Sequence, residues 1–439
     1  MRSLRLMTLA PGHFHAALVQ KSAHPAVHRR AYVYAPLDAD LVAHLDRLAA
    51  FNARPADPTA WELDVRAGAD YLARFLREQP GNAVVLSGKN RPKIDLMAAA
   101  VANGLAVLAD KPWVVEAADF PKLEAVFRDA AAREVFVWDV LTERHEVTNR
   151  LQRELVRDPA VFGTWQAGSP AVPALALESV HHLKKAVAGR PLRRPWWWFD
   201  PAVSGDALAD VGTHLADLAL WLVAPDEAVD HTRDVAVLAA ARRPLVLTPG
   251  QFTELTGLPA YPPELAPRAD GNLDYAGNTA VTFALRGVHV KLTTRWEYES
   301  AGGDTHAAVA RGTGATVAVR QVPGGSPEVF VAAAGDHRRV GRALREKCAG
   351  WQREFPGVGV EDRGNEMRLI VPAALRTTHE DHFAAVLDEF VRYFHTPRAV
   401  APWERPNALA RYFITTQGVE LARRPNPHRP GKGSGTGFA

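Results

Sequence analysis

Cysteine is almost absent from this chain, since Cys348 is the only one among 439 residues. A single cysteine forms no intrachain disulfide and builds no cysteine-based zinc site, and this usage agrees with a cytoplasmic location, which we expect. Long apolar runs are lacking too: no stretch approaches the roughly 18 apolar residues of a membrane-spanning helix. Residues 4–9 are apolar but end at Pro11-Gly12 without a cleavage motif, so they favour a buried strand over a secretion signal.

An excess of either charge is also missing. The chain has 52 lysines and arginines against 49 acidic residues, a formal net charge of +3, and the two signs are interspersed. This distribution differs from the basic surface of a nucleic-acid-binding protein. The one basic cluster lies in the Pro- and Gly-rich end, residues 423–439, which we expect to be disordered. We therefore expect neither a nucleic acid nor a membrane as a partner.

What is present is a regular alternation of strand and helix signals over the first 140 residues. Such an order is typical of a parallel sheet with connecting helices. The predicted strands are residues 4–10, 31–35, 61–65, 82–87, 105–109 and 135–140, and the predicted helices include 15–21, 69–78, 93–103 and 118–133. The pattern predicts an α/β domain over residues 1–140 with a doubly wound parallel sheet.

After residue 141 the pattern changes. We expect helices at 146–156, 206–223 and 379–395, the last with an apolar stripe. Two pairs of β runs flank Arg286-Gly287 and Gly312-Thr313-Gly314, and short turns of this composition are typical of hairpins. Residues 141–422 are therefore expected to form a second α/β domain on a largely antiparallel, open sheet.

The loop after the first strand occupies the place of a phosphate-binding turn but is poor in glycine. Such turns need glycine because backbone N–H groups must approach a pyrophosphate at a helix N-terminus. In residues 10–15 only the central Gly12 is present. The second strand lacks the acid expected at its end, and Asp38 follows slightly late. Asp38 is either a shifted ribose-binding carboxylate or an unrelated surface acid.

Two polar clusters are candidates for catalysis. Lys111 follows a buried strand and precedes Pro112, so it lies at the sheet edge where open α/β sheets bind ligands. A lysine there can stabilise a developing alkoxide, although a solvated loop lysine is the alternative. Asp210, His214 and Asp217 are spaced i, i+4, i+7 and share a helix face. A histidine with a carboxylate one turn away suits proton transfer, and a solvent-facing polar stripe has the same spacing.

Residues 82–112 and 205–217 together resemble the glucose–fructose oxidoreductase/inositol dehydrogenase (Gfo/Idh/MocA) family. The first segment has a loop ending in Asn90 and a strand closing in Asp-Lys-Pro, where the family has Glu-Lys-Pro; the second has the pattern Gly-x-x-x-x-Asp-x-x-x-His-x-x-Asp. The resemblance covers nearly the whole chain. It implies an N-terminal Rossmann domain that binds NAD or NADP, a second domain whose open sheet faces the cofactor, and a homo-oligomer, either a dimer or a tetramer. The phosphate loop and Lys93, where the family often has His, depart from the pattern.

The resemblance also implies roles for individual residues. Lys111, Asp210 and His214 would form the catalytic set. The cofactor would be bound by Ala10, Gly12, His13, Phe14, Asp38, Ser87, Asn90, Asp110 and Lys111. Within the family, the chain is similar to a subgroup of oxidoreductases marked by residues 9–15, 142–144, 181–182, 198–200 and 303–306.

Residues of the second domain are candidates for binding a carbohydrate-like substrate. The run Trp196-Trp197-Trp198 could line a sugar-stacking wall or form a core or subunit contact. The predicted substrate-binding residues are Arg144, His182, Trp198, Asp200 and Asp217.

Two histidine groups raise the question of a metal. His13 with His15, or His181 and His182 with His214, could in principle gather around zinc or manganese. Adjacent histidines point to different sides of a strand or helix and rarely bind one ion together. We therefore expect no metal.

The predicted function is that of an NAD(P)-dependent oxidoreductase. It would move a hydride between the nicotinamide and a secondary hydroxyl of a sugar, sugar derivative or cyclitol. His214 would take the hydroxyl proton, Lys111 would stabilise the alkoxide, and Asp210 would orient His214 or contact the substrate. The same residues would also serve an enzyme that retains NAD and cleaves a glycoside by oxidation, elimination and reduction. A third alternative is a non-catalytic nucleotide-binding protein with a decayed loop.

Overall fold

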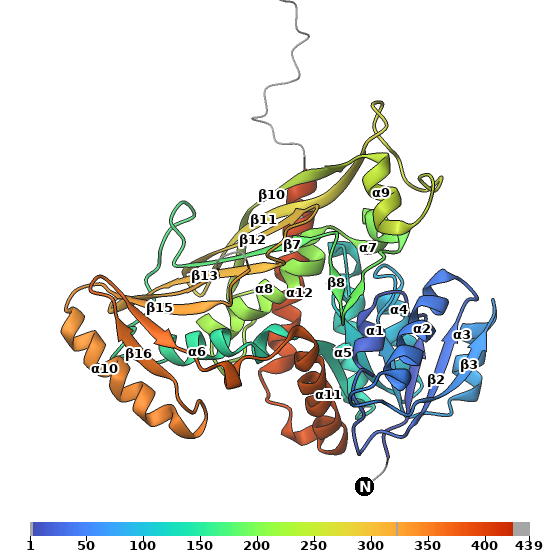
Figure 1. Cartoon of the computed structure of the whole chain (residues 1–439), viewed down its shortest axis with the longest axis horizontal. Coiled ribbons are helices and arrows are strands. Elements are labelled where there is room, and N and C mark those ends of the chain that lie inside the picture. Colours follow the sequence, from blue (N-terminus) through green and yellow to red (C-terminus); the bar gives the residue numbers. More distant parts are fainter. Residues whose placement is uncertain (1–2, 322–323, 425–439) are drawn as a thin grey trace, which may run out of the picture.

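The computed structural model describes residues 3–321 and 324–424, which form two large β-sheets with helices packed on them and one two-stranded sheet (Figure 1). In that part of the chain, no helix combines the length and the apolar composition needed to cross a membrane.

The first sheet has six parallel strands in the order β3-β2-β1-β4-β5-β6. β1 lies at its centre, where Met7 pairs with Tyr32 on one side and with Val84 on the other. Its strands are β1 (Leu6–Leu9), β2 (Arg30–Ala35), β3 (Glu62–Ala67), β4 (Ala83–Leu86), β5 (Ala106–Asp110) and β6 (Val137–Val140), and its helices are α1 (His15–Leu18), α2 (Ala39–Ala53), α3 (Tyr71–Glu78), α4 (Lys93–Ala102) and α5 (Phe120–Ala132). The predicted doubly wound Rossmann sheet is confirmed, although α1 is a single turn and ends before Lys21.

The second sheet has nine strands in the order β10-β11-β12-β7-β13-β14-β15-β17-β16. All its neighbouring pairs are antiparallel except β12 and β7, which run parallel. The strands are β7 (Leu175–His182), β10 (Val235–Leu247), β11 (Leu273–Leu285), β12 (Val288–Glu297), β13 (Thr305–Arg311), β14 (Ala315–Arg320), β15 (Glu328–Ala333), β16 (Gly359–Asp362) and β17 (Met367–Ile370). Both predicted hairpins are present, and positive φ angles of 50° at Arg286 and 82° at Gly287 close the first one in the turn that twisted strands prefer. The prediction of a largely antiparallel sheet is confirmed.

The remaining helices follow β6 in the chain. They include α6 (Val147–Val156), α7 (Pro201–Ser204), α8 (Ala207–Val223), α9 (Pro249–Thr256), α10 (His337–Gly350), α11 (His379–His395) and α12 (Glu404–Arg423), and a small hairpin is formed by β8 (Ala186–Val187) and β9 (Arg190–Pro191). Four of these helices, α6, α8, α10 and α12, pack on this sheet. α8 is buried along almost its whole length because it lies between the sheet and α12. Its position brings its N-terminal turns close to the first sheet.

The last two helices return to the first sheet (Figure 1). Phe383 and Phe390 of α11 share an apolar core with Leu6 of β1, and Tyr412 of α12 shares another core with Met7. The two sheets are therefore joined by packing as well as by the chain. Of the predicted basic tail, Arg423 belongs to α12, and residues 425–439 lie outside the described part.

Candidate active site

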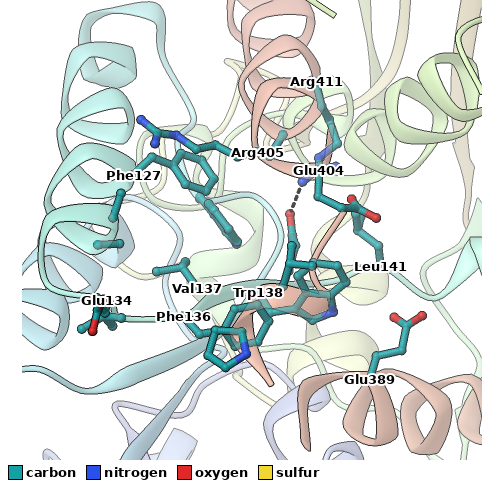
Figure 2. A pocket seen from close by; sticks show the side chains of 18 of the residues that line it. Phe127, Glu134, Phe136, Val137, Trp138, Leu141, Glu389, Glu404, Arg405 and Arg411 are labelled. Carbon is teal, nitrogen blue, oxygen red and sulfur yellow. Dashed lines mark hydrogen bonds and ion pairs between the residues drawn. The ribbon is translucent and has the colours of Figure 1, made fainter. Parts of the chain in front are cut away.

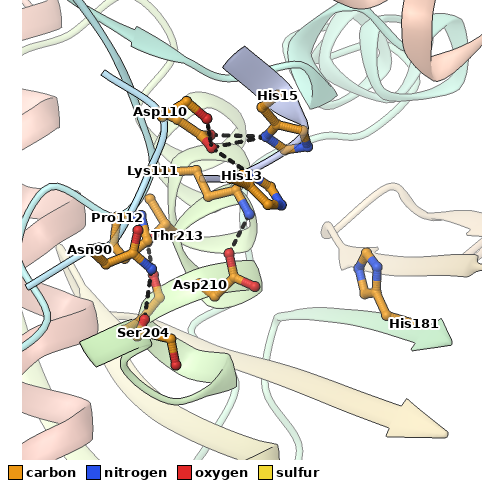
Figure 3. A network of polar contacts seen from close by, with 12 residues as sticks. His13, His15, Asn90, Asp110, Lys111, Pro112, His181, Ser204, Asp210 and Thr213 are labelled. Atoms are coloured by element: carbon orange, nitrogen blue, oxygen red, sulfur yellow. Dashed lines mark hydrogen bonds and ion pairs between the residues drawn. The ribbon is translucent and has the colours of Figure 1, made fainter. Parts of the chain in front are cut away.

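The predicted catalytic lysine lies where the first sheet meets α8. Lys111 directly follows β5, and its Nζ is 2.5 Å from Oδ1 of Asp210 in the first turn of α8 (Figure 3). The two residues are 5% and 6% exposed. Burial alone would lower the pKa of Lys111, but the carboxylates of Asp210 and Asp110 outweigh it and leave that pKa above its usual value. The site therefore holds a buried ammonium group.

Asp110, the last residue of β5, gathers three side chains around its carboxylate. Nδ1 of His13 lies 2.8 Å from Oδ2, Nδ1 of His15 lies 3.0 Å from Oδ1, and the Ser87 hydroxyl donates to Oδ2 at 2.9 Å. Although burial opposes ionisation, these imidazoles hold the pKa of Asp110 well below its usual value. The loop after β1 is thus fixed to the end of β5 through its side chains.

Lys93 braces the same edge of the sheet from α4. Its buried ammonium donates to Oδ1 of Asn90 at 2.8 Å and to the carbonyls of Asp110 and Pro112 at 2.7 and 3.1 Å. Burial lowers the pKa of Lys93 to about 8. Nδ2 of Asn90 in turn donates to the carbonyl of Ser204 at 2.7 Å, which ties the loop after β4 to the segment before α8.

The three predicted catalytic residues line one cavity of about 90 Å³. His214 faces it one turn of α8 after Asp210. Burial, together with the nearby Lys111 and His15, holds the pKa of His214 well below its usual value, so its imidazole is neutral. Its Nδ1 is buried and has no hydrogen-bond partner among the residues that the structure describes. A neutral imidazole beside an ammonium group can accept a proton from a hydroxyl that the ammonium polarises.

The residues predicted to bind the cofactor are divided between several places. Ala10, Asp38 and Ser87 line a cavity of about 120 Å³ at the ends of β1, β2 and β4. The Asp38 carboxylate also caps α2 by accepting from the Leu41 N–H at 3.0 Å. Gly12, His13 and Phe14 line a second cavity of about 270 Å³. Asn90, Asp110 and Lys111 have the contacts described above.

Trp197 lies directly over the phosphate-type loop. Its Nε1 donates to Oδ2 of Asp40 at 2.7 Å, and a Cβ at Gly12 would stand 3.0 Å from Cζ2 of this indole. The N–H groups of Gly12 and His13 both donate to the Ser87 carbonyl at 3.0 Å. An acid after β2, a glycine at the close approach and a lysine after β5 fit the chemistry of a dinucleotide. The indole packs against Gly12 and holds Asp40, a residue that lines both the 120 Å³ and the 270 Å³ cavities.

Arg144 and Asp217, both predicted to bind substrate, lie outside the residues that line the 90 Å³ cavity. Arg144 forms a bidentate ion pair with Asp217 at 2.6 Å, and Asp217 also accepts from Arg411 at 2.6 Å. Arg411 bonds Asp139 at 2.9 Å beside a separate cavity of about 620 Å³ at the free edge of β6 (Figure 2). Burial raises the pKa of Asp139 to about 6. These four residues connect β6, α8 and α12.

Of the other residues predicted to bind substrate, Trp198 lines the 90 Å³ cavity, whereas Asp200 and His182 form structural hydrogen bonds. Trp198 lines the cavity, stacks on His13 with ring centroids 5.3 Å apart and donates its Nε1 to the Tyr275 hydroxyl at 3.0 Å. Asp200 accepts from the Ala202 N–H at 2.8 Å and so caps α7. His182 is buried, and its backbone N–H donates to Asp304 at 2.9 Å.

Several residues of the cavity were not assigned a role from the sequence. They are His15, Glu143, His181, Lys185, His306 and His379. Asp304 fixes two of them, because Nδ1 of His181 lies 3.1 Å and Nζ of Lys185 lies 2.5 Å from its carboxylate. In the sequence, residues 303–306 carry only the resemblance to the subgroup, since nothing in the sequence relates them to residues 181–185.

Residues 151–423 match the protein family described as "Putative oxidoreductase C terminal domain", which is more than half of the chain. The chain belongs to this family. An oxidoreductase of the same label from Parabacteroides merdae, known from its crystal structure, is 38% identical, with a TM-score of 0.93 over 96% of this chain and 98% of that one. The protein is accordingly an oxidoreductase with a Rossmann-like sheet.

More distant structures share the fold. An oxidoreductase so labelled from Erwinia carotovora atroseptica is 13% identical, with a TM-score of 0.60 and coverage of 96% of this chain and 99% of that one. The 3-ketoreductase KijD10 from Actinomadura kijaniata, solved in an open conformation with TDP-benzene and NADP, is 15% identical, with a TM-score of 0.55 over 95% and 97% of the two chains. No curated protein matches the chain.

Proposed function

We propose that the chain is a nicotinamide-dependent oxidoreductase of the Gfo/Idh/MocA type, which acts on a secondary hydroxyl of a sugar, sugar derivative or cyclitol. The observation that carries this proposal is the set Lys111, Asp210 and His214 in one cavity at the carboxyl edge of the first sheet. The NADP in the KijD10 structure supports a nicotinamide coenzyme for this fold. The coenzyme, when bound, supplies the hydride acceptor.

The protein's own groups manage the proton and the charge on oxygen. His214, held neutral by burial, accepts the proton of the substrate hydroxyl at an imidazole nitrogen. The Lys111 ammonium stabilises the negative charge that develops on that oxygen as it becomes a carbonyl. Asp210 holds the ammonium in place through the 2.5 Å contact, so its role is to position Lys111 rather than His214. Trp198 provides an apolar wall against which sugar C–H groups can pack.

The small volume of the cavity implies that the substrate binds to a more open conformation of the protein. About 90 Å³ is far below the roughly 300–1,000 Å³ of typical small-molecule sites. Ala10, Gly12, Asp38 and Ser87 would hold the adenosine and pyrophosphate portion of the coenzyme once Trp197 has moved. Opening at Trp197 would join the cavities that line this edge.

The test combines coenzyme binding with turnover. Thermal shift assays with NAD and NADP should show stabilisation of both the wild type and Lys111→Met, while a panel of monosaccharides and glycosides should be turned over by the wild type only. We expect Lys111→Met and His214→Asn to lose about 10²–10⁴-fold in turnover. Lys122→Met and His337→Asn, which change surface residues of the same types, should keep wild-type rates. Near wild-type turnover by Lys111→Met contradicts the proposal, and product formation without net reduction of the coenzyme indicates glycoside cleavage.

We further propose that the protein is a homo-oligomer, a dimer or a tetramer, that associates through the second sheet. Leu238 and Val246 of β10 are 44% and 39% exposed on the face that carries no helix. Light scattering after size exclusion should give a mass of two or four chains, and a single-chain mass at micromolar concentration contradicts this.

A further inference from the structure

A cluster of imidazoles lines the cavity beside the proposed catalytic residues. His13 and His15 both turn Nδ1 toward Asp110, at 2.8 and 3.0 Å, and their ring centroids are 4.0 Å apart. Within residues 3–321 and 324–424, these three residues are the one group whose potential ligand atoms all lie within 4.8 Å of one another. The expectation of no metal rests on the histidines alone and does not include Asp110 as their shared partner, because Asp110 lies almost 100 positions later.

The contacts around Asp110 determine which nitrogens are free. An ionised carboxylate only accepts hydrogen bonds, so the Nδ1 atoms of both rings carry hydrogen. Each Nε2 therefore lies on the side of its ring away from Asp110, and both rings extend toward the side where His181 lies (Figure 3). A histidine whose far N–H is held by a carboxylate is the usual arrangement behind a metal ligand.

A third imidazole lies within reach. His379, the first residue of α11, lines the same cavity, and its ring centroid is 5.7 Å from that of His15. Two imidazoles bound to one ion at about 2.1 Å have ring centroids roughly 4.5–5.2 Å apart. The separation of 4.0 Å between His13 and His15 and that of 5.7 Å between His15 and His379 lie on either side of this range, so the rings must shift before all three bind one ion.

The charges around the cavity also bear on whether a metal cation can bind beside the imidazoles. The ammonium groups of Lys111 and Lys185 are paired with Asp210 and Asp304, each at 2.5 Å. Glu143 adds an acidic group to the lining. These two ammonium groups are thus paired with their own carboxylates, while Arg194, which also lines the cavity, donates to the carbonyls of Leu183 and His182.

We propose that His13, His15 and His379 form a binding site for a divalent transition-metal ion of the Zn²⁺ class, with Asp110 as the carboxylate that orients two of the ligands. Three protein ligands leave one position open, as in catalytic rather than structural zinc sites. Lys111 and His214 line the same cavity as the three imidazoles, so a substrate oxygen at the open position would be close to the proposed catalytic residues. The proposal is independent of hydride transfer and goes beyond it.

The experiment measures metal binding without coenzyme or turnover. The full-length protein is stripped with a chelator and titrated with Zn²⁺ by calorimetry, and with Co²⁺ by visible absorption. We expect one ion per chain and the strong d–d bands of four-coordinate Co²⁺. His13→Asn, His15→Asn, His379→Asn and Asp110→Asn should each weaken Zn²⁺ binding by at least about 10-fold. His337→Asn, which removes a surface imidazole paired with Asp362, is the matched control and should bind as the wild type does.

His379→Asn is the decisive variant because it changes an exposed helix start and leaves the contacts of Asp110 intact. An unchanged melting temperature shows that the apo fold is preserved. Loss of the Co²⁺ bands in this variant supports the proposal. Zn²⁺ binding that equals the wild type in His379→Asn, or no binding by the wild type, overturns it and leaves Asp110 with its imidazoles as a purely hydrogen-bonded network.

Discussion

A double-mutant cycle on Lys111 and Asp210 can distinguish what their ion pair contributes to stability from what Lys111 contributes to catalysis. The two groups lie 2.5 Å apart and are almost fully buried, so removing one charge leaves the other unpaired away from water. Breaking such a pair costs about 3–5 kcal/mol, whereas removing both charges is close to neutral. We therefore expect Lys111→Met and Asp210→Asn each to lose about 3–5 kcal/mol of unfolding free energy, and the double variant to recover to within about 1–2 kcal/mol of wild type.

The assay is thermal unfolding together with turnover. The single variants should melt roughly 4–10 °C below the wild type, and all three variants should be inactive because the ammonium is missing or displaced. Lys122→Met breaks the exposed pair with Asp95 and should change stability by less than about 1 kcal/mol. Single variants within about 1 °C of wild type, or a double variant as unstable as the sum of the two, would refute the reasoning. Turnover by the double variant would refute the chemical role of Lys111.

Three further outcomes are expected. Asp40→Ala removes the acceptor of the Trp197 indole N–H and should tighten NAD or NADP binding by up to about 10-fold in calorimetry; unchanged or weaker binding argues against the opening at Trp197. Arg411→Met deprives two buried carboxylates of a cation and should cost about 3–5 kcal/mol, which a melting temperature near that of the wild type would contradict. In the folded protein the pKa of Lys93 is about 8, below its usual value of 10.5. Between these two pH values the unfolded chain therefore binds more protons than the folded one. The contribution of Lys93 to the free energy of unfolding consequently rises with pH from about 8 to 10.5. Urea unfolding should show that the stability of the wild type relative to Lys93→Met increases from pH 8 to 10, and a constant difference is the opposing result.

The first sheet was predictable because its central strands, β1, β4 and β5, are buried on both faces. Parallel strands of this kind are continuous apolar runs, such as residues 83–86 and 106–109, and they stand out from the polar helices between them. β10 was missed because most of its residues are exposed and the run contains arginines and a proline. β7 was missed because it alternates buried and half-buried positions with polar residues. Exposed strands lack the continuous apolar run by which a buried strand is recognised in a sequence.

The candidate site was predicted unevenly for a similar reason. Lys111, Asp210 and His214 were found because their spacing and their place at a strand end or on a helix face are local properties of the sequence. The convergence of His13 and His15 on Asp110 depends on how the loop after β1 folds back onto the sheet. Asp217 shares the helix face of Asp210, yet it reaches Arg144 and Arg411, because further turns along α8 bring it to a different neighbour.

The return of α11 and α12 to the first sheet affects the order in which the chain can fold. Leu6 and Ala83 find Phe383 and Phe390 only after nearly 400 residues have been synthesised. The segment that forms the first sheet therefore leaves the ribosome with one apolar face uncovered, and that face stays exposed to other molecules until the C-terminal helices have been synthesised. Expressed alone, residues 1–140 should be prone to aggregation, and adding α11 and α12 in trans is the way to rescue them.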